Sequence, residues 1–301
     1  MSLLLGLGLA LVSTVVLDVG YLLQQRSAAS LPALRARHPV AALHAFLWAR
    51  RWLLGVVLTL AGWLVYLAAL SLADISLVQA TSAGGIAILA VLAVRWFGER
   101  LSPSERLGTA LAAVGLLALG LSLIGYDDSG RERASDLDVA LWIGVSAAVA
   151  LVLLVPGAAR VASAAAVGGL AAGLLFGAGD VATKGLMVTI PGGPGVADVL
   201  ASPFLYAMLA VYGLGFVVQQ LAFQRGAAVV AIGVMVAATN VSPIVAGLAV
   251  FDDPLPNRAL GLVLRVGGFA LALAGSALLA RVSEGEAPAP APAAAPVGVA
   301  S

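Results

Sequence analysis

The feature that most constrains this chain is its series of long apolar stretches with almost no charged residue inside them. Hydrophobic residues make up 61% of the sequence and charged residues only 10%, whereas a soluble domain carries about 25% charged residues. A helix needs about 20 apolar residues to cross the hydrocarbon core, and only helices or closed barrels satisfy the backbone in lipid. The alternating pattern typical of transmembrane strands does not occur in the sequence. The sequence therefore predicts an all-α polytopic membrane protein.

Nine of these stretches are predicted to span the membrane. The mean hydropathy is +1.06, and polar or glycine- and proline-rich segments such as 98–103 and 191–195 separate the spans. The segment 35–51 is too short to cross and is flanked by arginines, so we expect it to lie on the membrane surface. The predicted spans cover residues 2–23, 52–73, 75–97, 105–124, 138–156, 163–188, 200–222, 227–250 and 258–281.

We divide the chain into two transporter halves, residues 1–124 and 157–282. A polar loop over 125–137 and a bridging span over 138–156 connect the halves. The alanine- and proline-rich tail, 283–301, is predicted to be disordered and cytoplasmic.

The two halves contain a weak internal repeat. Residues 62–121 align with residues 215–274 without a gap, at a constant offset of 153. The copies lie five spans apart, so they are predicted to face opposite ways across the membrane, as the inverted repeats of secondary transporters do. Chance similarity between apolar helices is the alternative explanation. The matching pairs include Gly62 with Gly215, Pro103 with Pro256, Gly108 with Gly261 and Gly115 with Gly268.

The loop charges predict the orientation, because cytoplasmic loops carry an excess of arginine and lysine. One set of loops holds eleven arginines and the other set only Arg131, Arg133 and Arg258. We therefore expect a cell-membrane protein with its N-terminus outside and its C-terminus in the cytoplasm. The eleven are Arg26, Arg35, Arg37, Arg50, Arg51, Arg95, Arg100, Arg106, Arg160, Arg225 and Arg281.

Several motifs resemble the drug/metabolite transporter superfamily, which has an EamA-like fold, and within it the NIPA-type magnesium-transporter branch. The first span from Gly6 to Arg26, the sequence Phe-Gly-Glu-Arg-Leu at 97–101 and Thr-Lys-Gly-Leu at 183–186 carry this resemblance. The resemblance covers about residues 6–124 and 168–281 and implies nine spans with the N-terminus outside.

The chain also departs from that family. The membrane-embedded Glu and Asn of the family's second span fall on Trp63 and Tyr66, and its three lysines after span one fall on Gln24, Gln25 and Arg26. The resemblance therefore implies the fold more strongly than it implies magnesium as the substrate.

Charged residues inside the membrane are costly and mark candidate functional sites. Asp18 lies on a face of the first span with Thr14 and Tyr21, and Asp180 lies four residues before Lys184 in span six. We expect Asp18 and Asp180 to bind a coupling ion, a cationic substrate or a metal ion, one near each mouth of a central cavity. For Asp180 and Lys184, a purely structural ion pair is the alternative.

Uncharged polar residues extend this candidate site. The remaining candidates for substrate or ion binding are Tyr66, Gln79, Ser82, Gln219, Gln220 and Asn240. Hydrogen bonding between helices is the alternative role for each of them.

The sequence favours a secondary transporter that works by alternating access. Magnesium or another divalent cation and a small organic metabolite or drug both remain open as substrates, and a non-transporting membrane scaffold is the alternative from another class. We predict no enzymatic activity and no cofactor, because no nucleophile–base constellation, phosphate-binding loop or Cys/His cluster appears in the sequence. The net charge of +1 argues against nucleic-acid binding. The expected partners are the lipid bilayer and the transported solute or cation, with a homodimer left open.

Overall fold

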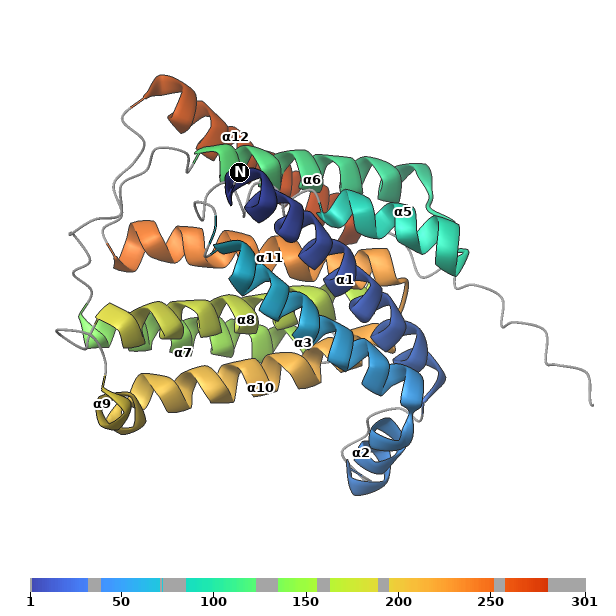
Figure 1. Ribbon diagram of the computed structural model, residues 1–301, viewed down its shortest axis with the longest axis horizontal. Coiled ribbons are helices and arrows are strands. Elements are labelled where there is room, and N and C mark those ends of the chain that lie inside the picture. Colours follow the sequence, from blue (N-terminus) through green and yellow to red (C-terminus); the bar gives the residue numbers. More distant parts are fainter. Residues whose placement is uncertain are drawn as a thin grey trace, which may run out of the picture.

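The fold, seen in a computed structural model, is a bundle of long helices that lie side by side (Figure 1). The structure describes residues 2–31, 39–70, 72, 85–122, 135–155, 163–188, 195–251 and 258–280. All regular structure in these ranges is helical. The helices are α1 (Ser2–Ser30), α2 (Pro39–Trp48), α3 (Arg50–Leu70), α5 (Gly85–Phe97), α6 (Pro103–Ser122), α7 (Asp136–Leu153), α8 (Ala164–Val188), α9 (Val196–Ala201), α10 (Pro203–Phe223), α11 (Ala228–Val250) and α12 (Ala259–Ala280).

Seven of the described helices are long and apolar enough to cross a membrane: α1, α6, α7, α8, α10, α11 and α12. This confirms the all-α, multi-pass architecture. Helices α3 and α5 fall on the other two predicted spans, 52–73 and 75–97, and the first part of the latter lies outside the described residues. The count of nine spans stays a prediction. Helix α2 has ten residues, too few to cross.

Local sequence signals set where several helices begin. Ser102 and Glu105 form a reciprocal cap on α6: the Ser102 N–H donates to Glu105 Oε2 at 2.7 Å, and the Glu105 N–H donates to Ser102 Oγ at 3.2 Å. Pro103 follows this cap at the first helical position, where its missing N–H costs nothing. Ser135 caps α7: its Oγ accepts from the Asp138 N–H and donates to Asp138 Oδ2.

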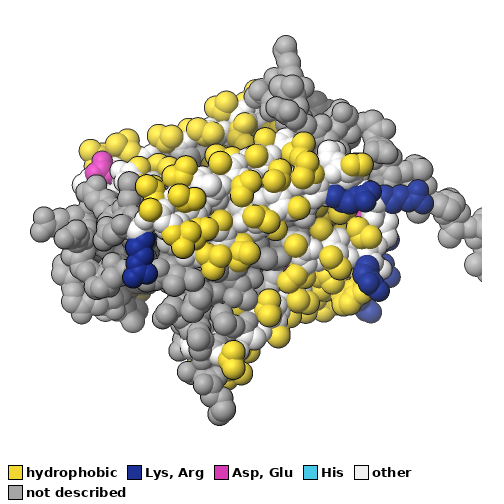
Figure 2. All heavy atoms as spheres, turned by 90° about the horizontal axis from the view of Figure 1, so that it is seen from above, with side chains coloured by type: hydrophobic (Ala, Val, Ile, Leu, Met, Phe, Trp, Pro, Cys, Tyr) yellow, Lys and Arg dark blue, Asp and Glu magenta, His cyan; other side chains and the backbone are white. Residues whose placement is uncertain are grey.

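The exposed surface of the bundle is suited to lipid. Large apolar side chains stay exposed along the helices, as with Leu60 at 59% and Val263 at 66%. The face in Figure 2 shows a broad hydrophobic band with Lys and Arg side chains at its two ends. This distribution places the membrane normal along the helices.

One end of the bundle carries most of the described arginines, and we call it the arginine-rich end. It is formed by the C-terminal ends of α1, α5 and α10 and the N-terminal ends of α3 and α6 (Figure 1). Its described arginines are Arg26, Arg50, Arg51, Arg95, Arg100, Arg106 and Arg225. The opposite end carries Arg258 with the carboxylates of Asp136, Asp138 and Asp198.

Helices at corresponding places in the two predicted halves run in opposite directions. In Figure 1, α1 runs toward the arginine-rich end and α8 runs away from it, and the same reversal holds for α3 and α10, α5 and α11, and α6 and α12. Helix α1 packs mainly on α3, and α8 packs mainly on α10 and α11. An inverted repeat requires this arrangement.

Helices α6 and α12 cross where the repeat partners Gly115 and Gly268 meet. A Cβ on Gly115 would lie 2.7 Å from the Gly268 carbonyl oxygen, and a Cβ on Gly268 would lie 2.8 Å from that of Gly115. The contacts are reciprocal, since Gly115 also meets Ala272 and Gly268 meets Leu119. Such exchange of contacts is typical of a two-fold axis, and only glycine lets the backbones approach this closely.

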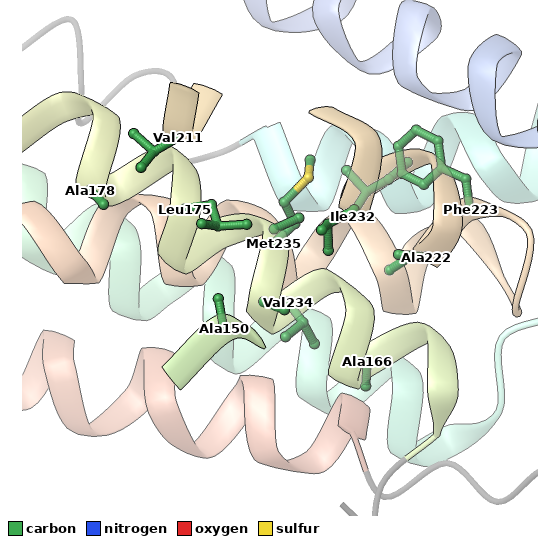
Figure 3. Packing of buried hydrophobic residues seen from close by; sticks show 14 of the residues in the cluster. Ala150, Ala166, Leu175, Ala178, Val211, Ala222, Phe223, Ile232, Val234 and Met235 are labelled. Carbon is green, nitrogen blue, oxygen red and sulfur yellow. The ribbon is translucent and has the colours of Figure 1, made fainter. Parts of the chain in front are cut away.

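The core of the second half lies between α8, α10 and α11 (Figure 3). Leu175 on α8, Phe223 on α10 and Ile232 on α11 are completely buried. Small residues such as Ala222 let the helices pack closely, because a Cβ on Gly168 would lie only 2.8 Å from its Cβ. This packing holds the helix that carries Asp180.

Candidate functional site

Asp18 is buried near the middle of α1. Its side chain is only 6% exposed, and it lies 16 residues, or about 24 Å, from the start of the helix. Its neighbour is the start of α5, since a Cβ on Gly85 would lie 3.8 Å from Asp18 Oδ2 and 2.6 Å from the Thr14 methyl. Glycine at position 85 therefore leaves open the space beside the carboxylate.

Within the described part of the chain, one oxygen of the Asp18 carboxylate has no hydrogen-bond donor. Oδ2 is buried and accepts no hydrogen bond from the described residues. A buried carboxylate oxygen that lacks a partner is costly, and such groups inside a membrane mark ion or substrate paths. Thr14 does not satisfy it, because the Thr14 hydroxyl donates to the Ala10 carbonyl at 2.9 Å.

Asp180 lies at the corresponding depth of α8 but has a different environment. It is also 16 residues from the start of its helix, and its side chain is half-buried. Tyr212 on α10 donates its hydroxyl to Asp180 Oδ1 at 2.6 Å. A Cβ on Gly179 would lie 2.7 Å from the Tyr212 ring, so this glycine lets the ring reach the carboxylate. Sequence reasoning missed Tyr212, because its partner lies on another helix.

Lys184 lies toward the end of α8. Its Nζ is 4.6 Å from the centroid of the Phe251 ring, at the end of α11. A cation over an aromatic face is attracted by the ring's quadrupole, by about 0.5–2 kcal/mol. Phe251 is 1% exposed, so this contact places the lysine against the closing turn of α11.

Three of the uncharged candidates lie on α10 and α11, and their hydrogen bonding differs. Gln220 is buried and accepts a hydrogen bond from Trp52 at 2.8 Å. Gln219 is also buried, and its Nε2 has no partner in the described part of the chain. Asn240 is exposed and donates to the Val236 carbonyl of its own helix at 2.8 Å.

For three further candidates the structure gives little or no information. Tyr66 is half-buried and packs beside Ala10 and Ala69. Gln79 and Ser82 lie outside the described residues.

A pocket lies between α7, α8, α11 and α12, and none of the candidate residues lines it. Its walls are mainly apolar and include Leu174, Val241 and Leu273, with Trp142 and Ser242 among the few polar ones. The carboxylates therefore belong to a different part of the fold.

Among the described residues, no group of three or more His, Cys, Asp or Glu side chains comes together. In this part of the chain, a metal ion would therefore have to be held by fewer than three of these side chains. Magnesium is commonly bound by one or two carboxylates while it keeps several of its waters.

Outside the spans, Glu99 connects the two halves at the arginine-rich end. Gly98 has a φ of 70°, and this left-handed turn, which favours glycine, ends α5 just before Glu99. Glu99 Oε1 accepts from the Ala228 N–H at the start of α11, at 3.1 Å. Burial raises the pKa of the Glu99 carboxyl, while the N–H groups of Ala228 and Val229 oppose that rise.

Comparisons with known proteins agree with this architecture. The family described as Magnesium transporter NIPA matches residues 1–285. The chain is 27% identical over 285 residues to Probable magnesium transporter NIPA9 of Arabidopsis thaliana, covering 90% of this chain and 80% of the relative. No solved structure matches significantly. This chain therefore belongs to the NIPA magnesium transporter family, a class of multi-pass membrane cation transporters rather than enzymes.

Proposed function

We propose that this protein carries Mg²⁺ or a similar divalent cation across the cell membrane by alternating access, with Asp18 as the carboxylate that receives the ion. The observation that carries the proposal is the buried Oδ2 of Asp18, which accepts no hydrogen bond from the described residues. A divalent cation is a chemically reasonable occupant, because it supplies the positive charge that this oxygen lacks.

The opposed directions of α1 and α8, and of the other helix pairs, support the mechanism. Two inverted halves can exchange conformations, so that a site between them opens to one side and then to the other. The glycine crossing of α6 and α12 is the axis about which we propose that the halves rock.

Asp180 is proposed as a second carboxylate on the path. Because α1 and α8 run in opposite directions, the equal depths of the two aspartates along their helices fall toward opposite ends of the bundle. An ion could then pass from one carboxylate to the other. We propose further that the arginine-rich end faces the cytoplasm, as its excess of positive charge favours.

The direct test is ion uptake by the purified protein in proteoliposomes that contain a Mg²⁺-sensitive dye. A panel of Mg²⁺, Ca²⁺, Mn²⁺ and Co²⁺ separates the divalent ions, and a panel of organic cations tests the alternative substrate class. We expect uptake of Mg²⁺ in the native protein and its loss in Asp18→Asn.

The matched control is Asp136→Asn, which removes an exposed carboxylate at the start of α7. It should transport like the native protein. Uptake of organic cations without any divalent uptake would overturn the proposed substrate, and full activity of Asp18→Asn would overturn the proposed site.

A further inference from the structure

One face of α1 meets α10 over the last turns of the helix. Tyr21, Gln24, Gln25 and Ala28 occupy positions i, i+3, i+4 and i+7, which share a helix face. All four contact α10 or the turn that follows it. The face begins one turn after Asp18 and continues to the arginine-rich end.

The layer nearest Asp18 is aromatic. The rings of Tyr21 on α1 and Phe223 on α10 meet edge to face, with centroids 6.5 Å apart and an interplanar angle of 70°. Phe223 is completely buried. This pair joins the two halves about 5 Å beyond the carboxylate, counted along α1.

The next layer is a chain of buried hydrogen bonds. Trp52 Nε1 donates to Gln220 Oε1 at 2.8 Å, and Gln220 Nε2 donates to Gln24 Oε1 at 3.0 Å. Gln24 Nε2 then donates to Thr59 Oγ1 at 3.1 Å. Gln220 thus uses both ends of its amide to connect α10 with α3 and α1.

Trp52 is held in place by aromatic neighbours. Its ring meets Phe46 of α2 at 5.3 Å and Phe216 of α10 at 6.1 Å. It is only 6% exposed. The layer therefore connects three helices of the first half to one helix of the second half.

The outermost layer uses backbone carbonyls near helix ends. Gln25 Nε2 donates to the Gly226 carbonyl at 2.8 Å, and Gln224 Nε2 donates to the Ala28 carbonyl at 3.1 Å. The Ala28 carbonyl also accepts from the Leu31 N–H at 3.2 Å, so Gln224 is a second donor to it. Together the bonds join the C-terminal ends of α1 and α10.

We propose that these three layers form a gate, the α1–α10 gate, which is closed in this structure and separates Asp18 from the arginine-rich end. The inference rests on the proposed alternating access. In this state an ion reaches Asp18 from the opposite end, and separation of α1 from α10 is the step that releases it at the arginine-rich end.

The chemistry of the layers suits a contact that opens and closes. Each amide hydrogen bond contributes only about 0.5–1.5 kcal/mol net, because water replaces the partner when the bond opens. The α6–α12 crossing is built differently, from glycine backbones in direct contact. The gate can therefore separate while that crossing stays closed and acts as the pivot.

The first experiment locks the gate. The sequence contains no cysteine, so introduced pairs react without background. Gln25→Cys and Gly226→Cys are combined and joined by a short bifunctional thiol reagent that a reducing agent can cleave. We expect Mg²⁺ uptake to stop when the pair is bridged and to return on reduction. A bridged protein that transports at the unbridged rate would overturn the gate.

The matched control keeps Gly226→Cys and pairs it with Ala165→Cys. A Cβ on Gly226 would lie 2.7 Å from the Ala165 Cβ, and both positions belong to the second half. Bridging this pair should leave uptake within about twofold of the unbridged protein, because it connects parts that move together. Equal loss of uptake in the two bridged pairs would count against the gate.

A second experiment does not depend on transport and so separates the gate from the proposed function. Thr14→Cys, one turn from Asp18, is labelled with a membrane-impermeant thiol reagent applied to either side of sealed vesicles. We expect Gln220→Ala to increase labelling from the arginine-rich side about tenfold, since it removes the bonds to Trp52 and Gln24. Trp52→Phe, which removes only the indole donor and keeps the packing, should increase it less.

Unchanged labelling in both gate variants would overturn the proposal, even if Mg²⁺ transport holds. Conversely, increased labelling in a protein that carries no Mg²⁺ would support the gate and reject the proposed substrate.

Discussion

Asp18 and Asp180 look alike in the sequence and differ in the structure. Each is a single carboxylate 16 residues from the start of an apolar helix. Asp180 accepts a 2.6 Å hydrogen bond from Tyr212, whereas Oδ2 of Asp18 is buried beside Gly85 and accepts no bond from the described residues. Burial inside the membrane does not by itself make two carboxylates equivalent. Asp18, whose Oδ2 has no hydrogen-bond partner among the described residues, is the better candidate to receive an ion.

Asp18→Asn is the most direct test of the difference between the two aspartates. We expect Mg²⁺ uptake to fall more than about tenfold, which corresponds to a loss of at least 1.4 kcal/mol of ion binding or transition-state stabilisation. The melting temperature should stay equal or rise, because a charge at a helix centre costs about 2.5–3.5 kcal/mol to insert. Uptake and thermal unfolding in detergent measure the two effects. A large loss of stability together with the loss of uptake would indicate a structural role instead.

Asp180→Asn should have a smaller effect. The amide still accepts a hydrogen bond from Tyr212, so the local structure is kept while the charge is lost. We expect a reduction of uptake of about three- to tenfold, equivalent to roughly 0.7–1.4 kcal/mol. If Asp180→Asn abolishes uptake and Asp18→Asn does not, then Asp180, and not Asp18, is the carboxylate that receives the ion.

Tyr212→Phe tests whether the hydrogen bond accounts for the difference between the two aspartates. It removes the hydroxyl that donates to Asp180, so Asp180 then resembles Asp18. A carboxylate oxygen left without its partner costs about 1–3 kcal/mol of stability. Uptake should change by no more than about threefold, since the carboxylate itself remains. The double variant with Asp180→Asn tests whether the two residues act together. If the changes in the free energy of unfolding do not add, the residues act through their shared hydrogen bond. If they add, the residues act independently.

The smallest effect is expected from Lys184→Gln. It removes the cation over the Phe251 ring, a contact worth about 0.5–2 kcal/mol. We expect a modest fall in melting temperature and uptake within about twofold of native, consistent with a lysine that stabilises the end of α11. Uptake that falls as far as in Asp180→Asn would show that Lys184 belongs to the ion path.

Much of the architecture can be predicted from the sequence, because whether a segment forms a membrane-spanning helix depends on residues close together in the chain. Apolar runs of sufficient length predict helices in lipid, and the predicted spans at 163–188 and 227–250 agree closely with α8 and α11. Ser102, Pro103 and Glu105 show where α6 begins, because a cap is read from residues three positions apart. The family motif at 97–101 includes Gly98, whose positive φ ends α5.

The partners of the polar side chains could not be predicted in this way. Helical spacing placed Lys184 on the same face as Asp180, but it could not show that the carboxylate accepts from Tyr212, 32 residues away on another helix. Gln220 was a candidate for ion binding, and its described bonds go to Trp52 and Gln24. Spacing within one helix defines a face, but it does not say which helix that face will meet.

From the sequence alone we could predict apolar helices in lipid and one deep carboxylate in each of the predicted spans 2–23 and 163–188. The sequence also matched Gly115 with Gly268 as equivalent positions. That those two glycines touch each other is seen only in the tertiary structure. The same is true of the hydroxyl that donates to Asp180, and of the lack of any donor to Asp18 Oδ2 among the described residues. Hydrophobicity and residue spacing are properties of one helix, whereas burial, hydrogen bonds and close approach between helices depend on how the whole bundle packs.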